Sequence, residues 1–187
     1  MLFGEGEQPP FPILSRYPFL FSALLRWVVV FGTAFRVAYS SLHWGLGYAK
    51  VWVVPVLIYL VYSLVITAIL LRKPGLHANR RLFLFQFCMD TLFCTLFFYL
   101  SGNSDSDLYL NYLLPLVLVL EQALSLIPSL VLFTVVGAAY LIAAALMFRN
   151  CTWGCSFLHF FVRGYLPRMV IAAIVFLFGV MRGLRAK

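Results

Sequence analysis

The sequence predicts an all-α protein, a polytopic helix bundle that crosses a membrane six times with both chain ends in the cytoplasm. Three observations lead to this prediction. Hydrophobic residues make up 64% of the 187 residues and charged residues only 11%, whereas soluble domains hold about 45–50% and about 25%. The mean hydropathy is +0.98. Several apolar runs approach the roughly 20 residues that a helix needs to cross the hydrocarbon core. These properties exclude a soluble enzyme, a disordered tail and a disulfide-framework toxin.

The apolar runs define six predicted membrane spans. The first is apolar but holds Arg26 and Arg36, the second has no charged residue from Trp52 to Leu71, and the third has only Asp90. The last span carries Arg168 near its start. The predicted bounds are about 18–42, 52–71, 82–100, 108–125, 129–148 and 164–181.

The fourth and fifth spans come from one apolar stretch that has to be divided. Leu108–Phe148 runs for 41 residues and is too long for a single span. Pro128 is the predicted breaker, because proline removes a backbone donor and disfavours helix in the residue before it. We therefore expect a helical hairpin that turns near Ser125–Ser129. Pro115 is expected to kink the fourth span, which neighbouring helices tolerate by satisfying the freed carbonyl.

Charged segments predict the orientation. Arg72–Arg81 contains four basic residues in ten, which is typical of a cytoplasmic loop, whereas Ser101–Asp107 contains two acids and no base and should face outward. Residues 1–17 are acidic and proline-rich, and are predicted to form a cytoplasmic tail rather than a signal peptide. Residues 182–187 are predicted to be the cytoplasmic end or the start of a signalling helix. The net charge of +8 is assigned to orientation and to anionic lipid headgroups, not to nucleic acid.

Three ionisable residues fall inside the predicted spans at similar depth. Arg26 and Asp90 each lie roughly 12 Å from the inner face at about 1.5 Å per residue, and Glu121 lies a few residues before the expected hairpin turn. Ionisable groups within a membrane are costly and are therefore candidates for function. We expect a buried Arg26–Asp90/Glu121 cluster that senses protonation or binds a polar headgroup. The alternatives are a structural ion pair, or an Arg26 side chain that extends to the interface.

The sequence predicts neither a metal centre nor an enzyme, because of the positions of its cysteines and the absence of catalytic motifs. Cys88 and Cys94 are six residues apart on the third span and should face different sides as packing residues. Cys151 and Cys155 lie in a predicted outer loop, where a local disulfide could form in an oxidising compartment. A zinc site needs four ligands and only His159 lies near these two cysteines. No nucleophile elbow, phosphate-binding glycine loop or HExxH motif is present, so no catalytic residue is predicted.

Aromatic residues gather from the middle of the predicted membrane toward its outer half. They either pack in the core and at the lipid interface, or line a cavity for an apolar, quinone-like ligand. The residues are Tyr59, Tyr62, Phe97, Phe98, Tyr99, Tyr109 and Tyr112.

Two stretches of the sequence carry a resemblance to a known family, residues 86–92 (QFCMDTL) and residues 98–116 (FYLSGNSDSDLYLNYLLPL). They resemble the membrane input region of bacterial sensor histidine kinases, in which a helix with an aspartate ends in a Y-L-T-G-G turn. In that family a short outer loop then leads to a Y-x-L-P helix, and the best-known relatives are redox-sensing kinases whose outer loop is linked to quinone. This chain has Ser101 and Asn103 where the family favours Thr and Gly.

The resemblance implies an integral membrane module for sensing and signal transduction in a bacterial inner membrane. It implies a homodimer in contact with membrane lipid and with a cytoplasmic kinase or response-regulator system, and quinone as a cofactor. No phospho-accepting histidine box and no ATP-binding glycine motif occur in the sequence, so a kinase half would have to be separate. The residues expected to bind or sense the signal are Arg26, Asp90, Asn103, Asp105, Asp107, Tyr109, Pro115 and Glu121.

The alternative is a small six-span transporter, or the substrate-binding subunit of a vitamin importer. Such proteins share the size, the basic charge and the number of spans predicted for this chain. This alternative predicts a closed cavity with a tightly held ligand and a coupling surface on the cytoplasmic side.

Overall fold

The computed structural model describes residues 20–44, 46–73, 75–76, 79–101, 107–122, 126–149 and 161–185. Over these residues the chain is helical and contains no strand, which confirms the predicted all-α class. The helices are α2 (Leu20–Trp44), α3 (Leu46–Arg72), α4 (Arg80–Leu100), η2 (Asp107–Tyr112), α5 (Leu113–Glu121), α6 (Leu126–Arg149), η3 (Phe161–Tyr165) and α8 (Leu166–Arg185). The two short elements differ from α-helices, since η2 is a 3-10 helix and η3 is a single π-helical turn.

Four helices in the described residues are long and apolar enough to cross a membrane. They are α2, α3, α4 and α6, which occupy the places of the first, second, third and fifth predicted spans. The apolar segments are Phe21–Tyr39, Lys50–Arg72, Arg80–Leu100 and Leu126–Phe148. Around α5 the apolar helical segment is shorter, Leu110–Leu120.

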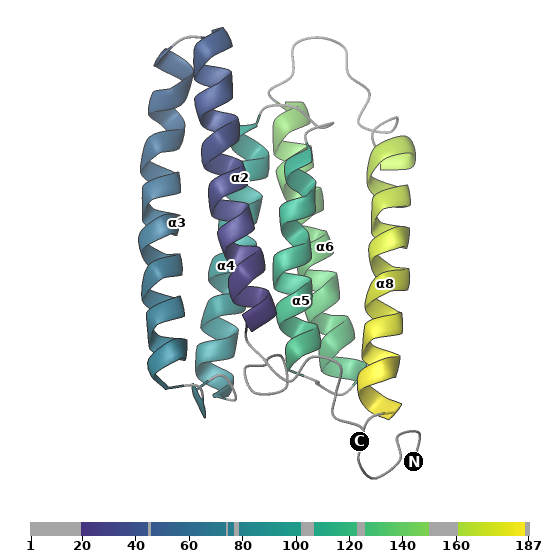
Figure 1. Cartoon of the computed structure of the whole chain (residues 1–187). Coiled ribbons are helices and arrows are strands. Elements are labelled where there is room, and N and C mark those ends of the chain that lie inside the picture. Colours follow the sequence, from purple (N-terminus) through teal and green to yellow (C-terminus); the bar gives the residue numbers. More distant parts are fainter. Residues whose placement is uncertain are drawn as a thin grey trace.

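The helices form a bundle in which each α-helix, including the short α5, runs opposite to the α-helix before it (Figure 1). The start of α2, the end of α3, the start of α4 and the end of α8 lie together at one end, which we call the α3–α4 end (Figure 1). The end of α2 and the starts of α3 and α8 lie at the opposite end, the α2–α3 end (Figure 1). Helix α5 lies within the bundle and packs against α2, α4, α6 and α8.

Large apolar side chains cover the outward faces of the bundle. Val28 and Phe35 on α2 are 65% and 74% exposed, Ile127 on α6 is 75% exposed, and Ile171 on α8 is 64% exposed. Soluble monomers rarely show continuous apolar surface of this extent. The outer surface is therefore compatible with a membrane protein whose helices face lipid.

Aromatic side chains fill the interior. Tyr59 on α3 packs against Phe97 on α4 with ring centroids 5.5 Å apart. Phe98 on α4 and Tyr112 at the end of η2 both pack against Tyr140 on α6, at 4.9 and 5.3 Å. These separations suit tilted and edge-to-face aromatic pairs. Core packing is thus the observed role of four residues from the sequence-based aromatic group: Tyr59, Phe97, Phe98 and Tyr112.

The turn between α3 and α4 is closed by a helix cap. Asn79 Oδ1 accepts hydrogen bonds from the backbone N–H groups of Arg81 and Leu82, at 2.9 and 3.3 Å. Asparagine is favoured at this position because its side chain satisfies N–H groups that have no partner within the helix. The turn concentrates exposed positive charge at the α3–α4 end, from Arg72, Lys73, Arg80 and Arg81.

The predicted fourth span differs from the structure. The sequence predicts one helix over 108–125 that turns near Ser125–Ser129, whereas α5 ends at Glu121 and α6 already begins at Leu126. The predicted hairpin is present, but its turn lies earlier than predicted, because Pro128 lies in the first turn of α6, where its missing N–H has no intrahelical acceptor to lose. The chain therefore bends before the proline, not around it.

Pro115 lies where the helix type changes. The first six residues of this region form the 3-10 helix η2, and Pro115 is the third residue of α5. A proline in the first turn of an α-helix sacrifices no backbone hydrogen bond. Pro115 thus stands at the beginning of α5, not inside a long helix as the predicted kink requires.

Two helices extend four or more residues beyond one of their predicted bounds. Helix α3 begins at Leu46 and contains Pro55, whereas the sequence predicts a start at residue 52. Helix α8 follows the π turn and continues to Arg185, past the predicted end at residue 181. Hydropathy marks only the apolar part of a helix, and polar residues such as Lys50 continue the same helix past that part.

Candidate functional site

A fully buried ion pair joins α2 to α4. Arg26 Nη2 donates to Asp90 Oδ2 at 2.7 Å, and Arg26 Nε donates to Asp90 Oδ1 at 3.2 Å. Both side chains are 0% exposed. Paired hydrogen bonds between a guanidinium and a carboxylate fix the orientation of the two groups as well as their separation. The pair therefore sets how α2 and α4 lie against each other.

Helix α3 and a second residue of α4 complete the polar contacts. The Tyr59 hydroxyl donates to Asp90 Oδ1 at 3.2 Å, and Gln86 Oε1 accepts from Arg26 Nη2 at 3.2 Å. The Tyr62 ring centroid lies 5.5 Å from Arg26 Cζ, within the range of a cation–π contact. Three helices thus converge on one pair of charges. We call Arg26, Asp90, Gln86 and Tyr59 the Arg26–Asp90 network.

The network lies well inside the bundle. Arg26 is six residues beyond the start of α2 and Asp90 is ten residues beyond the start of α4, or roughly 9 and 15 Å along the helix axes. Both helices start at the α3–α4 end (Figure 1). The structure therefore brings together the two residues that the sequence places at similar depth. Because Arg26 is fully buried, its side chain does not extend to an interface.

The network holds the helices together, but one of its donors has no acceptor. A buried ion pair recovers the cost of desolvation only when further hydrogen bonds surround it, and Tyr59 and Gln86 supply such bonds here. Arg26 Nη1 has no hydrogen-bond partner among the described residues. In a low-dielectric interior an unsatisfied donor carries a free-energy cost. A change that gives Nη1 an acceptor, or that separates the pair, would therefore alter the stability of the contact between α2 and α4.

The other predicted sensing residues do not join this network among the described side chains. Pro115 is buried in α5. For three more the structure describes only the backbone: Asp107 and Tyr109 in η2, and Glu121 at the end of α5. The remaining predictions lie outside the described residues: Asn103, Asp105, Cys151 and Cys155.

The two cysteines of α4 face different sides, as their spacing predicts. Cys88 is exposed and Cys94 is fully buried, and both are free thiols. The Cys94 thiol donates to the carbonyl oxygen of Asn111 at 3.2 Å, which ties α4 to η2. In the described part of the chain, no group of three or more His, Cys, Asp and Glu side chains lies close enough to hold a metal ion.

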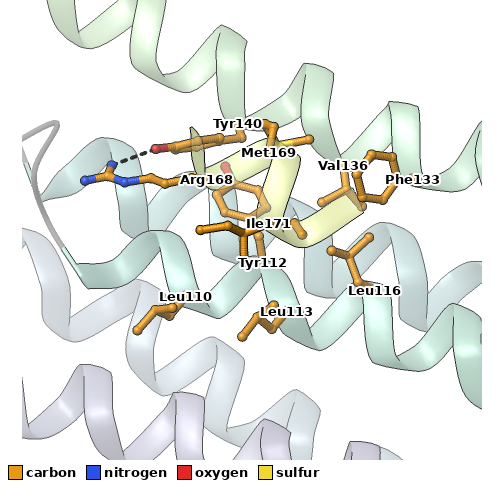
Figure 2. Close-up of a pocket in the computed structure, with 11 residues that line it drawn as sticks. Leu110, Tyr112, Leu113, Leu116, Phe133, Val136, Tyr140, Arg168, Met169 and Ile171 are labelled. Atoms are coloured by element: carbon orange, nitrogen blue, oxygen red, sulfur yellow. Dashed lines mark hydrogen bonds between the residues drawn. The ribbon is translucent and has the colours of Figure 1, made fainter. Parts of the chain in front are cut away.

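A pocket of about 280 Å³ lies between three parts of the bundle: α8, α6 and the continuous segment formed by η2 and α5 (Figure 2). We call it the α8 pocket. At one end of it Arg168 Nη1 donates to the Tyr140 hydroxyl at 2.9 Å. The rest of its wall is mainly apolar and includes Leu113, Leu116, Phe133 and Val136.

Helix α8 is tied to α6 close to the pocket. The Tyr165 hydroxyl donates to the carbonyl oxygen of Gly137 at 3.1 Å. Gly137 also allows α8 to come close, because a Cβ at this position would lie 2.7 Å from Met169 Cε. Tyr165 is the last residue of η3 and Arg168 is the third residue of α8, so these two hydrogen bonds and the contact of the Met169 side chain with Gly137 hold η3 and the start of α8 against α6.

Sequence reasoning did not select four residues that the structure places at these two sites. Gln86 was detectable, because a residue four positions before Asp90 lies on the same face of a helix. Tyr59 meets Asp90, and Arg168 meets Tyr140, only because α3 packs on α4 and α8 packs on α6. Spacing within a single helix carries no information about those contacts.

No protein-family model, no curated protein and no solved structure matches this chain. Its function therefore has to be inferred from its own residues, and the likeness of residues 86–116 to sensor-kinase input regions is a resemblance and not a family membership.

Proposed function

We propose that the chain is a sensory input module of the bacterial inner membrane that passes its signal along α8. The residues that resemble the input region of sensor histidine kinases, 86–92 and 98–116, include much of α4, η2 and the first half of α5. Among them are Asp90, which belongs to the Arg26–Asp90 network, and Tyr112, which lines the α8 pocket. These residues thus contribute to both polar features of the bundle.

The position of α5 is the observation that carries this proposal. Helix α5 packs against α2 and α4, which hold the Arg26–Asp90 network, and also against α8 (Figure 1). Its residues Leu114, Leu118 and Val119 are buried. Packed interiors change between discrete arrangements more readily than they deform continuously. A shift of α2 against α4 would therefore be taken up by α5 and transmitted to α8.

The signal would act by favouring one of two arrangements of the bundle. The Arg26–Asp90 network stabilises the arrangement described here. Hydrogen bonds to charged groups contribute about 1.5–3 kcal/mol each, and about 1.4 kcal/mol changes the ratio of two states tenfold. Gain or loss of one bond in the network would thus change the ratio of the two arrangements by about tenfold or more.

The proposal includes six crossings with both chain ends in the cytoplasm. The six residues of η2 at about 2.0 Å each and the nine residues of α5 at about 1.5 Å each reach roughly 25 Å, close to the hydrocarbon thickness of about 30 Å. The 3-10 geometry thus lengthens a segment that would be short as an α-helix. The exposed basic residues of the α3–α4 turn lie at the same end as the end of α8 (Figure 1). By the positive-inside rule this end faces the cytoplasm.

A fusion measures whether the network controls the output helix. The full chain is joined after Lys187 to the cytoplasmic half of a sensor histidine kinase, and autophosphorylation is measured in membranes at matched protein abundance. We expect Asp90→Asn to change the basal output by about fivefold, which corresponds to about 1 kcal/mol in the balance of two arrangements. The matched control is Arg36→Gln, which removes a charge from the same bundle at a residue outside the network.

Equal output from the wild-type chain, Asp90→Asn and Arg36→Gln would contradict the proposal. Native mass spectrometry of the purified chain in mild detergent tests the partner predictions at the same time. We expect a homodimer. A monomer that retains a tightly held vitamin would favour the importer alternative instead.

A further inference from the structure

The α8 pocket has one charged end and one apolar end. Among the described residues that line it, Arg168 is the charged one. Figure 2 shows the Arg168 side chain bonded to the Tyr140 hydroxyl at one end and Phe133, Val136 and Leu116 grouped toward the other. A ligand that matches this wall has an anionic head and an apolar body.

The charged and apolar ends lie at different depths. Arg168 is the third residue of α8, and α8 starts at the α2–α3 end (Figure 1). Phe133 precedes Tyr140 by seven residues on α6, which places it roughly 10 Å farther from the α2–α3 end. A single-chain amphiphile in the pocket would therefore lie along the helices, with its head on the side of the α2–α3 end and its chain extending toward the α3–α4 end.

The pocket opens where apolar side chains are exposed. Leu110, Leu113 and Ile171 line it and are 48%, 41% and 64% exposed. A ligand dissolved in the membrane can therefore reach the pocket sideways, without passing through water. The volume of about 280 Å³ is at the lower limit of small-molecule sites, which hold roughly 300–1,000 Å³. It suits one hydrocarbon chain and is too small for a lipid with two chains.

We propose that the α8 pocket binds a single-chain amphiphile with an anionic head, either a free fatty acid or a lysophospholipid. The head lies at Arg168, and the chain lies against Leu113, Leu116, Phe133 and Val136. Because the chain leaves lipid and not water, its burial contributes little to affinity. The charge-assisted contact with Arg168 in a low-dielectric site provides the selectivity. The inference concerns binding and goes beyond the sensory function, since it holds whether or not α8 transmits a signal.

Photolabelling of the full chain tests the proposal. The chain is reconstituted in phosphatidylcholine nanodiscs, and the probe is palmitic acid that carries a diazirine and an alkyne. We expect saturable labelling that maps to peptides containing residues 133–140 and 166–172. Unlabelled palmitate should compete, whereas hexadecanol, which has the same chain and a neutral head, should not.

Two pairs of variants separate the charged end from the apolar end. Arg168→Gln should weaken apparent affinity by about tenfold or more, as expected for the loss of a charge-assisted hydrogen bond, whereas Arg36→Gln should leave it unchanged. Ala172→Leu fills the pocket and should abolish labelling, whereas Ala173→Leu alters the adjacent residue of α8, which does not line the pocket. Arg168→Lys keeps the charge and should retain labelling. Unchanged gel-filtration elution verifies that each variant is folded.

The competitors decide between ligand sources and can overturn the proposal. Stronger competition by palmitate identifies a free fatty acid, and stronger competition by lysophosphatidate identifies a lysolipid. Equal competition by dioleoyl phosphatidate would contradict a single-chain site. Equal competition by hexadecanol or decylubiquinone would contradict an anionic head. Labelling that does not saturate, or that is unchanged in both Arg168→Gln and Ala172→Leu, would overturn the site itself.

Discussion

Replacement of Asp90 by leucine removes one partner of a fully buried ion pair. The Arg26 guanidinium then loses its two hydrogen bonds to the carboxylate, and the Tyr59 hydroxyl loses its acceptor. Gln86 remains as a neutral acceptor for Arg26 Nη2. A positive charge with 0% exposure is left without its counter-charge, so the folded bundle should lose stability.

The expected size follows from measured effects on buried ion pairs. Removal of one partner costs about 3–5 kcal/mol, whereas replacement of both by apolar residues is often neutral or stabilising. For a chain of this length about 1 kcal/mol shifts the melting temperature by about 2–4 °C, so Asp90→Leu should lower it by about 6–20 °C. The double variant Arg26→Met/Asp90→Leu should melt close to the wild-type chain.

The buried thiol of Cys94 provides the assay. In a chain with Cys88, Cys151 and Cys155 replaced by serine, a thiol-reactive fluorophore reports unfolding as Cys94 becomes accessible during heating in detergent. The argument would be refuted if Asp90→Leu melted within about 2 °C of its parent, a difference that corresponds to less than about 1 kcal/mol in the free energy of unfolding. A double variant that melts as low as the single variant would show that the uncompensated charge of Arg26 is not the cause of the loss.

Three further predictions concern local packing. Gly137→Ala should be tolerated, because Met169 Cε is the end of a flexible side chain and can move away. Gly137→Leu should force α8 outward and lower the melting temperature. Equal melting temperatures of the two variants would contradict the close contact at Gly137. Asn79→Ala should lower the free energy of unfolding by about 0.5–2 kcal/mol and accelerate hydrogen exchange at the amide of Arg81. Asn79→Asp should preserve the protection of this amide. Unchanged exchange in the alanine variant would rule out the cap. In detergent, N-ethylmaleimide should modify the outward-facing Cys88 faster than the buried Cys94, which should react only after unfolding, and equal rates would be incompatible with the orientation of α4.

Hydropathy and charge predicted the parts of this fold that depend on whether the helices face lipid or water. Apolar runs of sufficient length located α2, α3, α4 and α6, because helices that face lipid must be apolar over most of their surface. The same reasoning placed Arg26 and Asp90 at one depth. An isolated charge in such a segment is costly, which makes a partner at the same level a sound expectation.

The parts that were wrong depend on local backbone chemistry. Pro128 looked like a break in a 41-residue apolar stretch, but a proline also fits the first turn of a helix, and sequence spacing does not distinguish the two cases. The 3-10 geometry of Asp107–Tyr112 was missed for a similar reason, since its apolar pattern is also that of an α-helix.

The contacts of the α8 pocket could not be predicted at all. Tyr140 and Arg168 are 28 residues apart, and they meet because Gly137 permits α6 and α8 to approach. Small residues in the fifth span favour close packing on a neighbour, but they do not identify that neighbour. Helix pairing is a property of the whole bundle and not of any single segment.

Cysteine accessibility in intact cells tests the central claim most directly, because the proposed sensory function depends on α8 leaving the membrane on the side of the basic α3–α4 turn. Single cysteines are introduced into the cysteine-free chain at Gly75, Ser104 and Lys187, and a membrane-impermeant maleimide is applied from outside. We expect labelling at position 104 alone, with positions 75 and 187 labelled only after the membrane is permeabilised. Labelling of position 187 from outside while position 75 stays protected would place the two on opposite sides and contradict the six-crossing arrangement.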